Sequence, residues 1–328
     1  MTQHTHSQQS GLTLIELMVA MAIGLILVLG TFVVYTNGRA AYATNDNFTL
    51  MQENARFALG VIEPDLELAG YWGQHNDASA IRGSANDREA TGTPLGGIAN
   101  DCAENWVVQF DEHVSGFNDV EAGWSDWACI PNRFTTDTDI FAVRRVQGLP
   151  ANALQAGQFY LRSSEAPRSE VFLGNNEPTS LPASSLNYAL VANAYYVSPY
   201  SLAGANGTDN YPSLRRVQLV EQGGTPTMVD TEITTGVQDM QIQYGIGPVN
   251  VAGTRGGVAA YVSDIENLTA PNTMVRSMRV WLLMRSENPE IDHFDDIEYQ
   301  LGDKVVGPFN DNFRRIVASR TVFFRNLH

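Results

Sequence analysis

The chain has 328 residues, and 20 Lys and Arg against 36 Asp and Glu give it a formal net charge of −16. This charge disfavours binding to nucleic acid through the overall electrostatic field. Lys304 is the only lysine and Val305 follows it, which excludes a Walker A phosphate loop. A hydrophobic content of 44% is typical of a globular protein, but part of it is concentrated near the N-terminus.

The first predicted element is a membrane-spanning helix. Nineteen residues from Leu17 to Tyr35 carry no charge, and a helix of this length spans roughly the 30 Å hydrocarbon core of a bilayer. A cleaved secretory signal is disfavoured because residues 1–10 contain no Lys or Arg and residues 36–39 form a poor cleavage site. A plain single-pass anchor remains the alternative.

The junction before this helix contains one carboxylate. A polar leader ends at Gly11, and the apolar helix follows with Glu16 near its start. A charged side chain at the centre of an inserted helix costs about 2.5–3.5 kcal/mol, so an acidic residue in such a segment suggests a function. Cleavage after Gly11 would leave a free amine on Leu12, and that amine could pair with the carboxylate.

The run Gly11-Leu12-Thr13-Leu14-Ile15-Glu16-Leu17 resembles the class III signal of type IV prepilins and type II secretion pseudopilins. The resemblance implies cleavage after Gly11 by a prepilin peptidase, N-methylation of Leu12, and pairing of Glu16 with the terminal amine of a neighbouring subunit during assembly. Two features differ from the family pattern. The leader has His4 and His6 where Lys or Arg is usual, and Leu12 stands where Phe is most common.

An amphipathic helix is predicted to continue beyond the membrane. Its polar face carries Asn45, Gln52, Glu53, Arg56 and Glu63. Pro64 is expected to kink or end the helix near Glu63, so a helix from Leu12 to that point would be about 78 Å long. The apolar residues of its other face recur at helical spacing, with a gap at Asp65: Phe48, Met51, Ala55, Ala58, Ile62 and Ala69.

Residues 74–138 read as long loops, and they contain both cysteines. Cys102 and Cys129 are predicted to form a disulfide in an oxidising compartment, with two buried free thiols as the alternative. The bond would stabilise the fold by roughly 3–4 kcal/mol in the chain-entropy model. It also indicates a periplasmic domain, although Arg39 beyond the apolar segment favours the reverse orientation by the positive-inside rule.

Strand signals dominate the rest of the chain, without long amphipathic helices between them, which favours an antiparallel sheet over βαβ units. The predicted fold class is therefore α+β, with a long, partly transmembrane N-terminal helix packed on an antiparallel β-sheet domain, as in pilins. The predicted strands lie at 140–143, 158–161, 188–191, 194–197, 217–220, 237–244, 278–284 and 316–324.

Several segments together resemble the PilW family of type IV pilus minor pilins. They are residues 16–21, 68–71, 237–245, 280–286 and 320–326. The resemblance implies four parts: a leader at 1–11, a transmembrane and filament-core helix at 12–35, its amphipathic continuation at 36–69, and a periplasmic β-rich domain at 70–328. Before assembly the protein would span the inner membrane once; afterwards it would lie in the pilus, at its tip. The implied partners are other minor pilins and the major pilin, the prepilin peptidase, the inner-membrane assembly platform, a tip adhesin and the membrane.

Catalytic motifs are absent from the sequence, which contains no Gly-x-Ser-x-Gly, His-Glu-x-x-His or Gly-x-Gly-x-x-Gly. We therefore expect no enzyme activity, no cofactor and no metal. The acidic run 290–298 lacks an EF-hand pattern and reads as a solvated face. Asp137 and Asp139 read as turn or strand-edge residues, and His75 and His113 as surface polar residues.

Three functions are compatible with these features. The first is a minor pilin in the priming or tip complex of a type IV pilus. The second is a J-type minor pseudopilin of type II secretion, which shares the same N-terminal chemistry. The third is a membrane-anchored periplasmic enzyme or sensor, which would keep residues 1–11 and would need a clustered active site.

Overall fold

The computed structural model describes residue 11 and residues 13–83, 97–131, 133–166, 168–174, 176–201, 211–248, 257–265 and 273–326. The chain divides into two compact units, Met1–Thr49 and Leu50–His328. Leu12, one of the predicted processing residues, and the leader histidines His4 and His6 lie outside the described residues.

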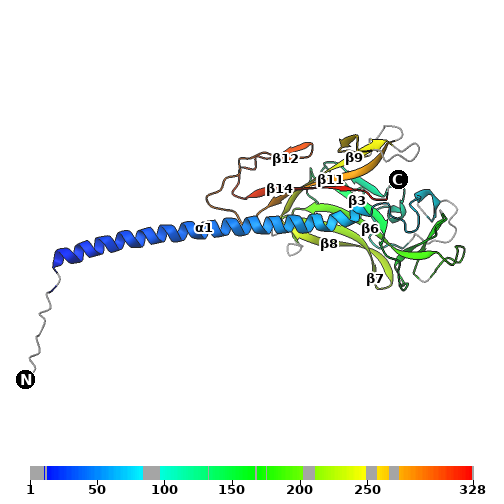
Figure 1. The fold of residues 1–328 in the computed structure, drawn as a ribbon, viewed down its shortest axis with the longest axis horizontal. Coiled ribbons are helices and arrows are strands. Elements are labelled where there is room, and N and C mark those ends of the chain that lie inside the picture. The colour runs from blue at the N-terminus through cyan, green and yellow to red at the C-terminus, as the bar shows by residue number, and fades with distance from the viewer. Residues whose placement is uncertain are drawn as a thin grey trace, which may run out of the picture. The chain divides into compact units, whose positions relative to one another are not determined.

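Helix α1 runs over Leu14–Glu67 and contributes to both units (Figure 1). Its buried apolar residues within the second unit are Met51, Ala55, Ala58, Ile62 and Leu66, of which the first four lie on the predicted stripe. The helix does not end near Glu63: Pro64 lies inside it, and the amide of Leu68 still donates to the carbonyl of Pro64 at 3.2 Å.

Buried polar contacts hold the last turn of α1 in place. Asp65 is 4% exposed, and its carboxylate accepts from Nε and Nη2 of Arg145 at 3.1 and 2.6 Å. Asn193 Nδ2 donates to it at 2.6 Å, and the hydroxyl of Tyr195 donates to the same oxygen as Asn193. These contacts explain why the helix continues past Pro64: its last turn is fixed by charged hydrogen bonds to the sheet.

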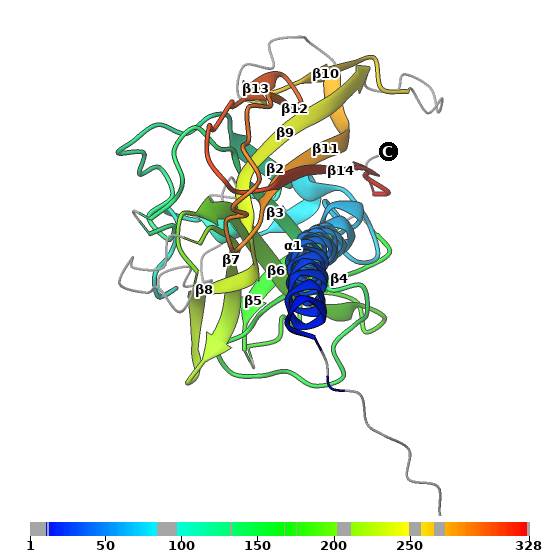
Figure 2. The same cartoon turned by 90° about the vertical axis from the view of Figure 1, so that its left-hand side faces the viewer.

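The second unit contains, in its described residues, an eight-stranded sheet with the order β1-β5-β4-β6-β3-β2, to which β7 and β8 are added beside β6 (Figures 1 and 2). Its pairings are antiparallel except for β1 with β5, which are parallel over two residues. The strands are β1 Ile81–Arg82, β2 Val114–Phe117, β3 Ile140–Val146, β4 Phe159–Ser163, β5 Ser169–Leu173, β6 Leu186–Ser198, β7 Ser213–Gln222 and β8 Thr225–Thr235.

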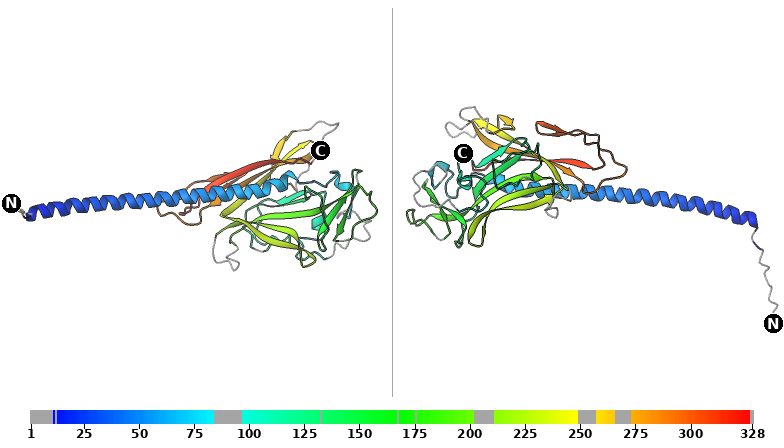
Figure 3. Two further views of the ribbon diagram at one scale, coloured as in Figure 1. Left: turned by 60° about the horizontal axis from the view of Figure 1, so that its bottom comes forward. Right: turned by 180° about the vertical axis from the view of Figure 1, so that it is seen from behind.

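A second sheet of the described chain has four antiparallel strands in the order β10-β9-β11-β14 (Figure 3). Gly236 joins β8 to β9 with φ +84°, a conformation that side chains disfavour. Its carbonyl accepts from the amide of Arg285 on β11, so the chain changes sheets at this residue. The strands are β9 Val237–Pro248, β10 Ala260–Val262, β11 Thr273–Arg285 and β14 Arg315–Phe323, and a separate hairpin pairs β12 Tyr299–Leu301 with β13 Lys304–Val306.

This arrangement confirms the α+β prediction. Two of the predicted strands, 188–191 and 194–197, are one strand in the structure, β6. The polar Asn193 interrupts the apolar pattern there, but it is buried because it hydrogen-bonds Asp65. Strands β2, β5 and β8 and the short β1, β10, β12 and β13 were not predicted.

The main hydrophobic core lies against the first sheet and includes the loop between the cysteines. Arg144, on β3, is fully buried there. Its Nε donates to the carbonyl of Trp106 at 2.7 Å, its Nη1 donates to the carbonyl of Glu112, and its guanidinium lies 4.4 Å from the centre of the Trp106 ring. Two short 3-10 turns, Ala78–Ala80 and Trp106–Val108, complete the described elements.

Candidate functional site

The start of α1 forms a capping box, in which the residue just before the helix and the third residue of the helix each hydrogen-bond to the other's backbone amide. The amide of Thr13 donates to Oε2 of Glu16 at 3.0 Å, and the hydroxyl of Thr13 donates to the same oxygen at 2.9 Å. In return, the amide of Glu16 donates to Oγ1 of Thr13 at 3.4 Å. The pair satisfies two backbone donors that a helix start leaves free.

Sequence reasoning assigned Glu16 only a role in charge pairing and missed this local one. The signal was visible, because Thr13-x-x-Glu16 directly precedes an apolar run. Gly11 lies two residues before Thr13 and is exposed, and a Cβ built on it meets nothing within 4 Å. The structure therefore leaves both Gly11 and Glu16 exposed.

The helix beyond Glu16 has an apolar surface that no described part of the chain covers. Every large apolar side chain from Leu14 to Tyr35 is between 53% and 76% exposed. Leaving such side chains in water costs about 1.5–3 kcal/mol each, so the segment as a whole would cost on the order of tens of kcal/mol. It is long and apolar enough to cross a bilayer, and it needs lipid or other apolar helices around it.

The predicted cysteine pair forms a disulfide between Cys102 and Cys129. The amide of Ala128 also donates to the carbonyl of Cys102 at 2.7 Å, which closes the same loop through the backbone. Trp127 packs edge-on against Trp106 and Phe117 inside this loop. The covalent link therefore holds an aromatic cluster together where secondary structure is sparse.

A group of carboxylates surrounds the single lysine. Lys304 Nζ donates to Oδ1 of Asp119 at 2.7 Å and to the carbonyl of Asp137, and it lies 3.9 Å from Oδ2 of Asp239. Burial raises the pKa of Asp239 to about 6 and that of Asp139 to about 8. Asp139 accepts the amides of Asp119 and of Ile242, so it joins a turn to β9 and has a structural role.

Two histidines are less exposed than the sequence suggested. His75 Nε2 lies 2.6 Å from Oγ of Ser169, and burial lowers its pKa. His113 packs edge-on against Phe324, and burial together with the charge of Arg144 lowers its pKa to about 4. The surface interpretation of His113 was wrong because Phe324, which covers it, comes from the far end of the chain.

The acidic run 290–298 contributes to ion pairs with arginines. Glu290 pairs with Arg314 at 2.8 Å, and the fully buried Asp295 pairs with Arg315 at 2.6 Å. Asp311 also pairs with Arg315, at 2.7 Å. Among the residues that the structure describes, no group of three or more His, Cys, Asp or Glu side chains is placed to hold a metal ion.

Comparison with known families agrees with the N-terminal chemistry. Residues 6–32 match the prokaryotic N-terminal methylation motif, and residues 194–326 match the PilW family, described as type IV pilus-assembly protein W. The second match covers β7–β14 and the C-terminal half of β6, and it includes three of the segments on which the PilW resemblance was based.

Comparisons with individual proteins add little. No curated protein matches the chain significantly in sequence. Among solved structures, the type IV-like pilin TTHA1219 from Thermus thermophilus is 16% identical over 53% of this chain and 87% of its own, with a TM-score of 0.23, which is too low to support an argument. Through its N-terminal methylation motif and its match over residues 194–326, the chain is similar to the PilW family of type IV pilus-assembly proteins.

Proposed function

We propose that this chain is a minor pilin that acts in type IV pilus assembly as part of a priming or tip complex. A prepilin peptidase would cut after Gly11 and methylate Leu12. Before assembly, the apolar segment of α1 would span the inner membrane, with residues 36–328 in the periplasm. The observation that supports this most is the capping box at Thr13 and Glu16, at the start of an exposed apolar helix and beside the cleavage position.

The geometry of the carboxylate supports a role in pairing between subunits. Both bonds from Thr13 end on Oε2 of Glu16. An ionised carboxylate has about four acceptor positions, so Oε1 remains available to a donor from another chain. In a low-dielectric environment a terminal amine of a neighbouring subunit would gain most from this contact. The local bonds would keep the carboxylate solvated until that amine arrives.

Intact-mass measurement of the protein from membranes and sheared pili tests the processing step. We expect a chain that begins at N-methylated Leu12. A chain that still begins at Met1 would exclude both the minor pilin and the secretion pseudopilin, and it would leave a membrane-anchored domain.

Substitutions at the capping box test the assembly step. Glu16→Ala and Glu16→Gln should both be cleaved normally but fail to enter filaments, because neither variant can neutralise an amine. Thr13→Ala is the matched control: it removes the hydroxyl contacts and keeps the carboxylate, so it should still be incorporated. Normal incorporation of Glu16→Gln would show that the negative charge is not needed.

Gene deletion separates the pilus role from the secretion role. Loss of twitching motility with normal exoprotein secretion supports the minor pilin proposal. The opposite pattern would assign the chain to a type II secretion pseudopilus, as a J-type minor pseudopilin.

A further inference from the structure

One edge of the second sheet is open. Strand β14 pairs with β11 on one side only and is the last strand of that sheet in the described chain. Two hydrogen bonds bound the ladder between these strands: the amide of Phe324 donates to the carbonyl of Arg276, and the amide of Ser286 donates to the carbonyl of Arg314. Bonded pairs in an antiparallel ladder alternate, so the even-numbered residues of β14 bond to β11.

The odd-numbered residues of β14 therefore direct their amides and carbonyls away from β11. All four of these side chains are exposed: Val317, Ser319, Thr321 and Phe323. In the part of the chain that the structure describes, no strand pairs with β14 on this side. Val317 is 38% exposed and Phe323 is 60% exposed. A nine-residue edge of this kind, with free backbone groups and apolar side chains, is a template for pairing with another strand.

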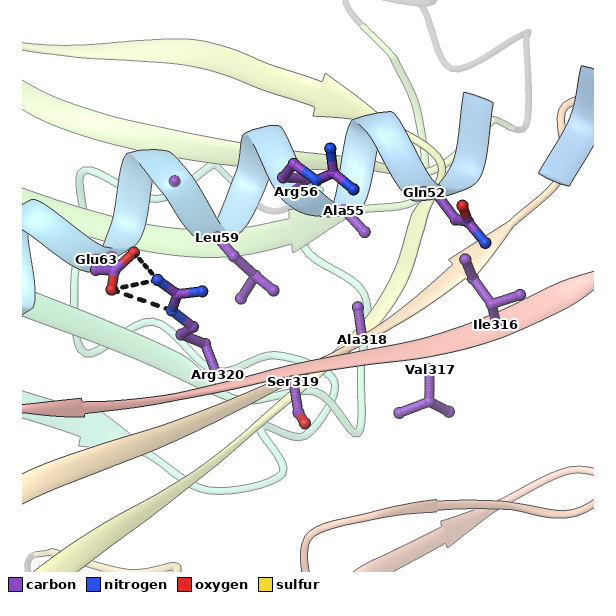
Figure 4. A pocket seen from close by; sticks show the side chains of 11 residues that line it. Gln52, Ala55, Arg56, Leu59, Glu63, Ile316, Val317, Ala318, Ser319 and Arg320 are labelled. Carbon is purple, nitrogen blue, oxygen red and sulfur yellow. Dashed lines mark hydrogen bonds and ion pairs between the residues drawn. The ribbon is translucent and has the colours of Figure 1, made fainter. Parts of the chain in front are cut away.

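A groove of about 480 Å³ runs between this edge and α1 (Figure 4). Ile316 and Ala318 point towards the helix, whereas Val317 and Ser319 point away from it (Figure 4). A strand added beside β14 would place every second side chain on the helix side, where Gln52, Arg56, Leu59 and Gly60 line the groove. The remaining side chains would lie on the same face as Val317 and Phe323.

Gly60 leaves space in this groove. A Cβ built on it meets nothing within 4 Å, although glycine inside a helix costs roughly 0.5–1 kcal/mol relative to alanine. Pro64 lies four residues later and has no amide, so the carbonyl of Gly60 also lacks its helical donor. The helix therefore presents an open, partly unsatisfied stretch of backbone opposite the open strand.

The charges of the groove indicate what could fill it. Arg320 is neutralised by Glu63, which accepts from its Nε and Nη2 at 3.0 and 2.6 Å. Arg56 is exposed and forms no ion pair with a residue that the structure describes, in a chain whose net charge is −16. A second copy of β14 is a poorer partner than an acidic strand, because β14 carries no acid that could pair with Arg56.

We infer that the β14 edge and the adjoining α1 groove bind an extended segment of another protein, whose apolar side chains alternate with polar ones that include a carboxylate. The segment would extend the second sheet by one strand, with its apolar side chains beside Val317 and Phe323 and its carboxylate near Arg56. This docking surface goes beyond the proposed function and does not depend on N-terminal processing.

The test uses the full-length chain in detergent and a defined probe. The probe is a fluorescent nine-residue peptide in which valine alternates with threonine and glutamate, and its dissociation constant is measured by fluorescence anisotropy. The same peptide with an N-methyl group on every amide cannot donate a hydrogen bond to the edge and should bind at least tenfold more weakly. Replacing its glutamates by lysine should weaken binding as well.

Two variants of the protein test the site separately, one on β14 and one on α1. Ser319→Pro removes an outward amide and leaves the β11–β14 ladder intact, and Gly60→Phe fills the groove from α1 without touching β14. Each should weaken binding at least tenfold, whereas the matched variants Ser319→Ala and Gly60→Ala should change it less than threefold. Thermal melts check that each variant is folded.

Three results would overturn the inference. The first is that the peptide does not bind the unmodified chain. The second is that Gly60→Phe and Gly60→Ala bind it equally well. The third is concentration-dependent dimerisation that Ser319→Pro abolishes, because a second copy of the chain would then be the occupant. A mature chain beginning at Met1 would instead contradict the proposed function and leave this inference standing.

Discussion

The buried carboxylate of Asp65 should be among the most sensitive positions of the second unit. Four hydrogen bonds from Arg145, Asn193 and Tyr195 to this carboxylate connect the last turn of α1 to β3 and β6. Removing one member of a buried ion pair costs about 3–5 kcal/mol, because the remaining charge is left without a partner. Asp65→Ala should therefore lower the free energy of unfolding by about this amount.

Chemical and thermal denaturation of the detergent-solubilised chain measure this effect. For a domain of this size about 3–5 kcal/mol corresponds to a fall in Tm of roughly 6–20 °C. Glu63→Ala is the matched control, because it breaks a surface pair of the same helix in which Arg320 is 52% exposed. Exposed pairs contribute about 0–1 kcal/mol, so this variant should change stability little.

A double-mutant cycle separates the ion pair from other effects of the substitution. Asp65→Ala and Arg145→Ala together should cost clearly less than the sum of the single changes, with a coupling energy above about 1 kcal/mol. If Asp65→Ala costs no more than Glu63→Ala, or if the cycle shows no coupling, the network does not hold the helix against the sheet.

Four further outcomes are expected. Burial keeps His113 neutral in the fold and lowers its pKa to about 4. Its contribution to stability should therefore be lost as pH falls from about 6.5 to about 4, at up to about 1.4 kcal/mol per pH unit. The difference in the free energy of unfolding between the protein and His113→Gln across this range measures the effect. Replacing Cys102 and Cys129 together by Ala should lower the free energy of unfolding by roughly 3–4 kcal/mol, measured with urea, and no loss would contradict the chain-entropy estimate. Gly60→Ala should raise the free energy of unfolding by roughly 0.5–1 kcal/mol, because its Cβ meets open space. Gly116→Ala should lower the Tm by several degrees, since its Cβ would lie 2.7 Å from the carbonyl oxygen of Ile140; an unchanged melt would refute the close packing there.

Local periodicity predicted much of the fold. The apolar stripe of α1 was visible because helical spacing repeats over many residues, and the strands around Val237 and Met278 were visible because their apolar residues are dense. Strand β8 was not predicted, since its sequence TPTMVDTEITT is mostly polar and several of its residues are only partly buried at the edge of the sheet. An edge strand needs fewer apolar residues, so its pattern is weaker.

Long-range contacts explain most of the other differences. The gap in the apolar stripe at Asp65 was seen, but its partners Arg145, Asn193 and Tyr195 are 80, 128 and 130 residues away. No local sequence pattern predicts a contact between residues so far apart in the chain. The same is true of Arg144, a charged residue that the core encloses. Whether a charged side chain can be buried depends on the partners that the tertiary structure places around it.

The scarcity of amines makes the N-terminus unusually easy to label. Lys304 supplies the single side-chain amine of the chain, and it is bound by Asp119 and by the carbonyl of Asp137. An ammonium held in this way reacts slowly with acylating dyes, whereas a terminal α-amine has a lower pKa and reacts readily. Such a dye would therefore attach at one end of the polypeptide and would remove the charge that pairing with Glu16 requires, so a chain labelled before assembly should stay in the cell envelope.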